Sequence, residues 1–146
     1  MQARHVLACT DLSPESLNAV EHAANHARAN KSHLTLLHVL DPQSFIPPQA
    51  VLDPQAGFAP HKEEAQAALA KIRDEKLSGL DGDAVLIVDH APARATCEYA
   101  AKHDVDLIVV GSHGRSGVDR WLIGSVAERV VRHAHCNVLV VRLPSS

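Results

Sequence analysis

The sequence predicts an α/β fold in which an open parallel sheet of five strands is sandwiched by four helices. Five short apolar runs alternate along the chain with four segments of helical periodicity. Such alternation is typical of a parallel sheet built with right-handed crossovers. The runs are almost continuously apolar, which indicates strands that are covered on both faces. With 146 residues, the chain is most simply one domain that spans residues 1–146.

The five predicted strands are short and rich in Val, Leu and Ile. They span His5–Cys9, Leu34–Leu40, Ala84–Val88, Asp106–Val110 and Val138–Val141. Because the chain has only one Trp, one Tyr and two Phe, we expect a core of aliphatic side chains.

The helices are predicted from apolar residues spaced three and four apart, which share one face of a helix. Ser13 suits the cap of the first helix and Pro14 its first turn. The second helix should run from about His61 to Leu77 and the third from Pro92 to His103. The inward positions expected in the four helices are Leu17, Val20, Ala24 and Ala27; Ala65, Ala68, Leu69 and Ile72; Thr96 and Ala100; and Ala127, Val130, Val131 and Ala134.

Residues 41–60 interrupt this alternation. The segment holds five of the eight prolines and almost no charge, and a loop of this length in a compact domain is usually functional or mobile. One hypothesis is a disordered connection between the second strand and the second helix. The other is a flexible lid whose Phe45, Ile46 and Phe58 cover a ligand.

Composition argues against several classes of protein. The net charge is −3 with acidic and basic residues interspersed, which disfavours a nucleic-acid partner. No apolar run is long enough for a membrane span, and no secretory signal is visible. The three cysteines lack CxxC spacing and are expected to be reduced thiols of a cytoplasmic protein. The eleven histidines lack the spacing of a zinc site, so no metal site is predicted.

The stretch GSHGRSGVDRWLIGS, residues 111–125, predicts a phosphate-binding site. It begins directly after the fourth predicted strand and ends where the fourth helix starts, and open α/β sheets bind ligands at the carboxyl ends of their strands. Gly111 and Gly114 would let backbone N–H groups approach a bulky anion. Gly124 and Ser125 would add helix-start amides and a hydroxyl.

Side chains in the same stretch support an anion. His113, Arg115 and Arg120 offer positive charge or hydrogen bonds. Two other phosphate-binding motifs are excluded, because a Walker A loop needs a lysine that this stretch lacks, and CTDLSPES replaces the GxGxxG of a dinucleotide-binding first turn.

The spacing Gly111-x2-Gly114-x9-Gly124-Ser125 resembles the ATP-binding signature of the universal stress proteins. The segments HVLACTDLSPES, LTLLHVLDP, DVDLIVVGSHGRSG and HCNVLVVR are similar to the first, second, fourth and fifth strands of that family. The resemblance implies a Rossmann-like sheet in the order 3-2-1-4-5, with its switch point between the first and fourth strands.

The resemblance also implies binding residues for ATP, with or without Mg²⁺. Asp11, beside Thr10, would contact the adenine or ribose side, and Val39 would hold the adenine through its backbone. The residues that would line the pocket or surround the ribose and phosphates are Val110, Gly111, Gly114, Arg115, Gly124, Ser125 and Val126, beside the His113 expected there from its chemistry. From the residues alone, Asp11 could instead cap the first helix together with Ser13.

By resemblance the protein would form a homodimer through the apolar edge strand at 138–141, where an exposed edge invites pairing. Asn137 stands where the family commonly has proline, and its N–H could extend the pairing. No nucleophile with a neighbouring base is apparent, so no catalytic residue is assigned. We therefore expect a nucleotide-binding regulatory module of the stress response with an unidentified protein partner. The alternatives are a slow Mg²⁺-dependent ATPase and a nucleotide-free interaction module.

Overall fold

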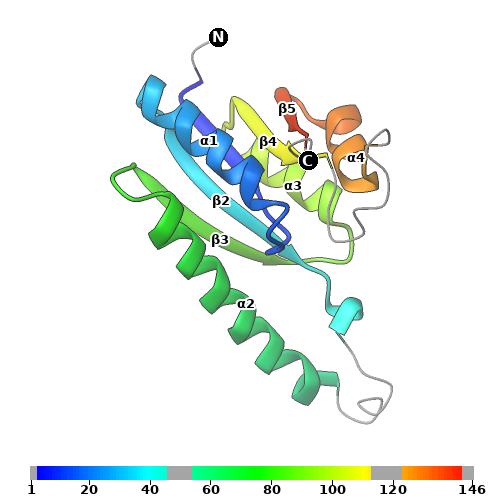
Figure 1. Ribbon diagram of the computed structural model, residues 1–146. Coiled ribbons are helices and arrows are strands. Elements are labelled where there is room, and N and C mark those ends of the chain that lie inside the picture. The colour runs from blue at the N-terminus through cyan, green and yellow to red at the C-terminus, as the bar shows by residue number, and fades with distance from the viewer. Residues whose placement is uncertain (1–2, 46–53, 113–122, 143–146) are drawn as a thin grey trace.

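Five parallel strands form a single sheet in the order β3-β2-β1-β4-β5 (Figure 1), which confirms the predicted class and strand order. The computed structural model describes residues 3–45, 54–112 and 123–142. The strands are β1 (His5–Cys9), β2 (His33–Leu40), β3 (Gly82–Val88), β4 (Leu107–Gly111) and β5 (Asn137–Val141). Each strand end lies within two residues of its predicted position.

Helices cover both faces of this sheet (Figure 1). They are α1 (Leu17–Asn30), α2 (Pro54–Lys76), α3 (Pro92–Lys102) and α4 (Ser125–His133), with a 3-10 helix, η1 (Pro42–Phe45), after β2. Apolar residues of α1 and α2 share one core with the sheet, and those of α3 and α4 share a second core on the opposite face.

The two cores explain why the strands are apolar along their whole length. In β1, Val6 and Ala8 face the core under α1 and α2, whereas Leu7 between them faces the core under α3 and α4. All three are fully buried. Successive side chains of a strand point to opposite faces, so a strand covered on both sides buries every residue.

The first helix begins later than predicted. Its N-cap is Ser16 rather than Ser13, and its first helical residue is Leu17. Residues 13–17 instead form tight turns, in which Ser16 N donates to the Ser13 carbonyl at 3.2 Å and Leu17 N to the Pro14 carbonyl at 3.2 Å. Such i→i+3 bonds are typical of the tighter turn that often precedes an α-helix.

The second helix begins earlier than predicted. It starts at Pro54 and continues through Pro60, so residues 54–60 are not loop. Proline lacks an N–H and usually ends a helix, so the sequence around Pro60 does not indicate a helix that starts before it. Residues 46–53 lie outside the described residues, as do the Phe45, Ile46 and Phe58 side chains, so the lid hypothesis stays a prediction.

Most of the predicted inward positions are buried, with one clear error in α4. Ala127 and Val130 are buried, but Val131 is 50% exposed. α4 is a short helix of nine residues beside the edge strand β5, and its buried face is narrower than the apolar spacing suggested.

Within the described ranges, no helix combines the length and apolar composition needed to cross a membrane.

Candidate functional site

A cavity of about 430 Å³ opens at the carboxyl ends of β1, β2 and β4, and the first turns of α3 and α4 complete its wall. The chain leaves β1 toward α1 on one face of the sheet and leaves β4 toward α4 on the other. The cavity therefore lies at the switch point of the sheet, which is where open α/β proteins bind ligands.

Most of the residues predicted for the site line this one cavity. They are Thr10, Asp11, Val39, Val110, Gly111, Gly124, Ser125 and Val126. His113, Gly114, Arg115 and Arg120 lie outside the described residues, so the structure does not place them. The residues that it does place come from strand ends, from the turn after β1 and from the start of α4, which are far apart in the sequence.

Sequence reasoning missed several residues of the cavity wall. They are Cys9, Ser16, Leu37, His38, Pro92, Thr96, Ser112 and Ala127. The predicted strand order places the ends of β1 and β2 side by side, so the last residues of both strands could have been included. Thr96 and Pro92 belong to α3, and no feature of the sequence indicated that α3 would reach the cavity.

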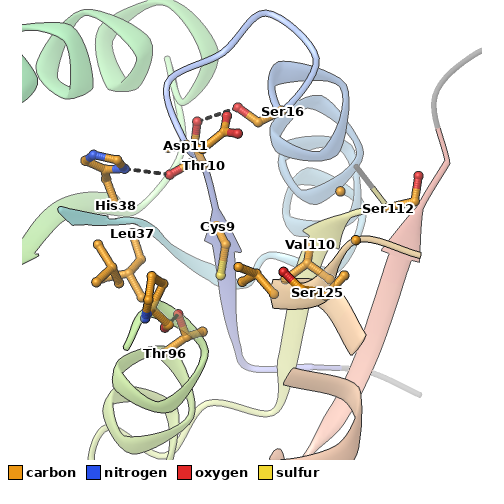
Figure 2. A pocket seen from close by; sticks show the side chains of 16 residues that line it. Cys9, Thr10, Asp11, Ser16, Leu37, His38, Thr96, Val110, Ser112 and Ser125 are labelled. Atoms are coloured by element: carbon orange, nitrogen blue, oxygen red, sulfur yellow. Dashed lines mark hydrogen bonds between the residues drawn. The ribbon is translucent and has the colours of Figure 1, made fainter. Parts of the chain in front are cut away.

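The turn after β1 is held by a chain of hydroxyl groups (Figure 2). Leu12 N donates to Thr10 Oγ1 at 3.0 Å, and Thr10 Oγ1 lies 2.7 Å from Ser16 Oγ. Ser16 Oγ in turn donates to the carbonyl of Ser13 at 2.8 Å. This chain holds Leu12 at a φ of 69°, a left-handed conformation that is uncommon for leucine.

Asp11 takes part in the same turn. Its Oδ1 accepts hydrogen bonds from Ser13 N, at 2.9 Å, and from Ser13 Oγ. The sequence left open whether Asp11 caps the first helix with Ser13. These two bonds stabilise the turn that precedes α1. Ser13 lies three residues before Ser16, which is the N-cap of the helix. The bonds hold the carboxylate of Asp11 at the wall of the cavity.

The end of β1 is also fixed to β2. The Nδ1 atom of His38 lies 2.8 Å from the carbonyl oxygen of Thr10, and this contact is buried (Figure 2). Cys9 is the last residue of β1 that pairs with β2, and its partner is Leu37. Val39 lies two residues further along β2. The backbone of Val39 thus reaches past the end of its neighbouring strand.

The opposite wall is the start of α4. Gly124 is the N-cap of this helix, and Gly124 N donates to the carbonyl of Ser112 at 2.6 Å, which ties the helix start to the end of β4. Ser125, Val126 and Ala127 form the first turn and all line the cavity. The first amides of a helix have no partner within the helix, and its N-terminus favours negative charge.

The described part of the cavity wall carries little charge. Among the described lining residues, Asp11 alone has a formally charged side chain. Burial raises the pKa of the Cys9 thiol to about 12. A hydrogen bond with Thr96 lowers this pKa, but its effect is smaller than that of burial. Because the thiolate is the reactive form, Cys9 contributes an uncharged, apolar surface to the cavity and no nucleophile.

The chain has the architecture of an open α/β protein, with a cavity at its switch point between a polar turn and a helix start. The sequence model of the universal stress protein family matches residues 2–142. This chain therefore belongs to the universal stress protein family, which confirms the resemblance noted from its sequence.

Relatives of known sequence match over nearly the whole chain. The universal stress protein MJ0531 of Methanocaldococcus jannaschii is 38% identical over 137 residues, which cover 92% of this chain and 79% of that protein. Universal stress protein A homolog 1 of Coxiella burnetii is 34% identical over 154 aligned positions, covering 97% of each protein.

Solved structures agree with the fold. The hypothetical protein MJ0577 superposes with a TM-score of 0.87 at 26% identity, with full coverage of both chains. A universal stress protein in complex with cAMP has a TM-score of 0.72 at 32% identity, covering 99% of this chain and 100% of that one. The universal stress protein of Archaeoglobus fulgidus in complex with dAMP has a TM-score of 0.62 at 25% identity, covering 96% and 98%.

Proposed function

We propose that the cavity binds an adenine nucleotide and that ATP is its physiological ligand. The observation that carries the proposal is the convergence of Asp11, Val39 and the first turn of α4 around one cavity. The complexes of related proteins with cAMP and dAMP support the same class of ligand here.

The base would lie at the β2 side of the cavity. Val39 would offer its backbone N–H and C=O to the edge of the adenine, and Leu37, Val110 and Cys9 would provide an apolar surface for the ring. Ligand pockets of this kind combine an apolar lining with a few polar groups that fix orientation. Asp11 would accept hydrogen bonds from ribose hydroxyls or from the base.

The phosphates would lie at the start of α4. The free amides of its first turn, the Ser125 hydroxyl and the helix dipole all favour an anion there. Gly124 has a φ of −60° and a ψ of 154°, which any residue can adopt. The backbone conformation therefore does not require glycine, and in this proposal the missing side chain leaves room for close approach of the phosphates. Contacts from His113, Gly114 and Arg115 stay predictions.

We propose a binding module rather than an ATPase. Efficient phosphoryl transfer needs Mg²⁺ ligands, a positioned water and charges around the γ-phosphate. Among the lining residues that the structure describes, the only carboxylate is Asp11, and its Oδ1 is already bonded to Ser13. Bound nucleotide would act as a signal that changes which protein partner is engaged. The cytoplasmic location and the partner itself stay predictions.

We further propose a homodimer through β5. This strand is at one edge of the sheet, and its Leu139 side chain is 41% exposed. Val131 and Val126 of the adjacent helix α4 are 50% and 44% exposed. Exposed apolar side chains beside an unpaired strand edge favour association with a second chain.

The direct experiment is to denature the purified protein with acid and identify any released small molecule by mass spectrometry. Release of an adenine nucleotide at a stoichiometric ratio supports the proposal. Protein that releases none, and that also fails to bind added ATP, would overturn it.

A further inference from the structure

The side to which each residue of β2 directs its backbone N–H and C=O follows from the hydrogen bonds that join β2 to its neighbours β1 and β3. Thr10 N donates to the Leu37 carbonyl at 2.9 Å, so Leu37 turns its backbone groups toward β1. Asp89 N donates to the Leu40 carbonyl at 3.1 Å, so Leu40 turns its groups away from β1, on the β3 side. Backbone groups alternate in direction along a strand, and Val39 therefore directs both its N–H and its C=O toward the β1 side.

If the parallel ladder between β1 and β2 continued by one more pair, the N–H and the C=O of Val39 would both form hydrogen bonds to the chain after β1. Since Cys9 pairs with Leu37, Asp11 would stand opposite Val39. In that register Val39 N would donate to the Thr10 carbonyl, and Leu12 N would donate to the Val39 carbonyl. Within residues 3–45, no backbone hydrogen bond joins Val39 to Thr10 or to Leu12.

Two hydrogen bonds of Thr10 account for the end of the ladder between β1 and β2. Its hydroxyl accepts the Leu12 N–H at 3.0 Å, which is the donor that the Val39 carbonyl would otherwise receive. The Thr10 carbonyl already accepts a hydrogen bond from the ring of His38 at 2.8 Å when Nδ1 carries the proton. The bond to Thr10 Oγ1 holds the Leu12 N–H toward the Thr10 side chain, and the chain then continues through Leu12 in a left-handed conformation, at a φ of 69°.

We propose that Thr10 is a positioning residue for base recognition: its hydroxyl diverts the Leu12 amide and so keeps the Val39 carbonyl available to the 6-amino group of a bound adenine. The inference rests on the proposed adenine site and adds the residue that keeps that site open. Adenine offers an amino donor next to a ring-nitrogen acceptor, and the C=O and N–H of one strand residue offer the complementary pair.

The test is Thr10→Val, which preserves the shape of the side chain and removes the hydroxyl. Without it, Leu12 N can donate to the Val39 carbonyl, and a ligand must first break that bond. We expect AMP to bind about three- to tenfold more weakly, the usual effect of one uncharged hydrogen bond. Purine ribonucleoside monophosphate, which lacks the 6-amino group, should lose less than about twofold, because it cannot use the Val39 carbonyl.

Two further variants separate positioning from general damage. Thr10→Ser keeps the hydroxyl and should bind AMP like the wild type. Thr35→Val is the matched control, because Thr35 is a buried β2 threonine whose hydroxyl donates to Asp83 Oδ1 at 2.7 Å, away from the cavity wall. It should leave AMP affinity unchanged.

A measurement on the wild type does not depend on any variant folding. Amide exchange followed by NMR should show the Val39 N–H exchanging faster than that of Leu37 in the free protein, and slowing when AMP is added. A Val39 amide already protected without ligand would overturn the inference, as would equal losses for AMP and the purine analogue in Thr10→Val. Wild-type protein that binds neither AMP nor ATP would overturn the proposed function itself, and this role with it.

Discussion

The ring of His38 and the backbone of Thr10 join the ends of two neighbouring strands, with Nδ1 of His38 2.8 Å from the Thr10 carbonyl oxygen. The contact is buried and lies at the cavity wall. It fixes the end of β1 relative to β2 before any ligand arrives. A wall fixed in this way reduces the ordering that binding would otherwise require.

Gly124→Val should weaken ATP binding without unfolding the protein. The φ of −60° and ψ of 154° at this position suit valine, whereas the added side chain would enter the space proposed for the phosphates. We expect a loss of affinity of at least about tenfold, or roughly 1.4 kcal/mol. Titration calorimetry measures the affinity, and a thermal melt of the same sample checks the fold. Unchanged affinity would argue against phosphates at the start of α4.

Asp11→Asn should weaken nucleotide binding while it preserves the turn. The amide retains an oxygen that can accept from Ser13, but it loses the charge that strengthens hydrogen bonds to ligand hydroxyls. We expect roughly five- to tenfold weaker binding of ATP. Phosphate release with Mg²⁺ is measured in parallel. Normal binding with abolished phosphate release would favour the ATPase alternative instead.

Leu139→Lys should convert the proposed dimer to a monomer, because it places a charge on the exposed edge strand β5. Leu139 is a better site than Val140, which packs against the core under α3 and α4. Val88→Lys is the matched control, since Val88 is 40% exposed and lies on β3, the opposite edge of the sheet. Light scattering gives the mass in solution. A dimer that persists in Leu139→Lys would exclude this interface.

Asp106 should contribute to the acid sensitivity of the fold. Hydrogen bonds from the backbone amides of His5 and Arg4, at 2.9 and 2.8 Å, lower the pKa of Asp106 below its ordinary value of 3.8. A lowered pKa in the folded state stabilises the protein above 3.8, and this contribution is lost as the pH falls through the folded pKa.

Asp106→Asn should therefore be less stable than the wild type at pH 7, with the difference shrinking as the pH falls below 3.8. Urea unfolding at a series of pH values measures this difference. A gap that stays constant between neutral and acidic pH would show that the charge of Asp106 has no part in it.

Much of the fold could be predicted because its cause is local. The continuous apolar runs gave the strands, since residues such as Val6 and Leu7 must both be buried when helices cover two faces. The helix starts were harder. Ser13 has the chemistry of a cap, and its hydroxyl accepts a hydrogen bond from Ser16 N at 3.3 Å, but it does so in the turn before the helix, which begins after Ser16. Pro60 has the chemistry of a helix breaker, yet α2 continues through it.

The residues of the candidate site also fall into those that could be predicted from the sequence and those that could not. Residues at strand ends, such as Asp11 and Val39, could be placed at the switch point because the family resemblance implied the strand order. Thr96 could not, because its place in the cavity wall depends on how α3 packs against the sheet. The hydrogen bond from the Leu12 amide to the Thr10 hydroxyl depends on the backbone course of the turn after β1, which no sequence pattern indicated.

The measurement that tests the central claim most directly is titration of ligand-free protein with ATP, AMP and GTP by calorimetry. The account predicts that both adenine nucleotides bind at one site per chain, and that GTP binds at least about tenfold more weakly, because its ring edge presents acceptor and donor in the reverse order. Protein that binds none of the three, or that binds GTP as tightly as ATP, would contradict it.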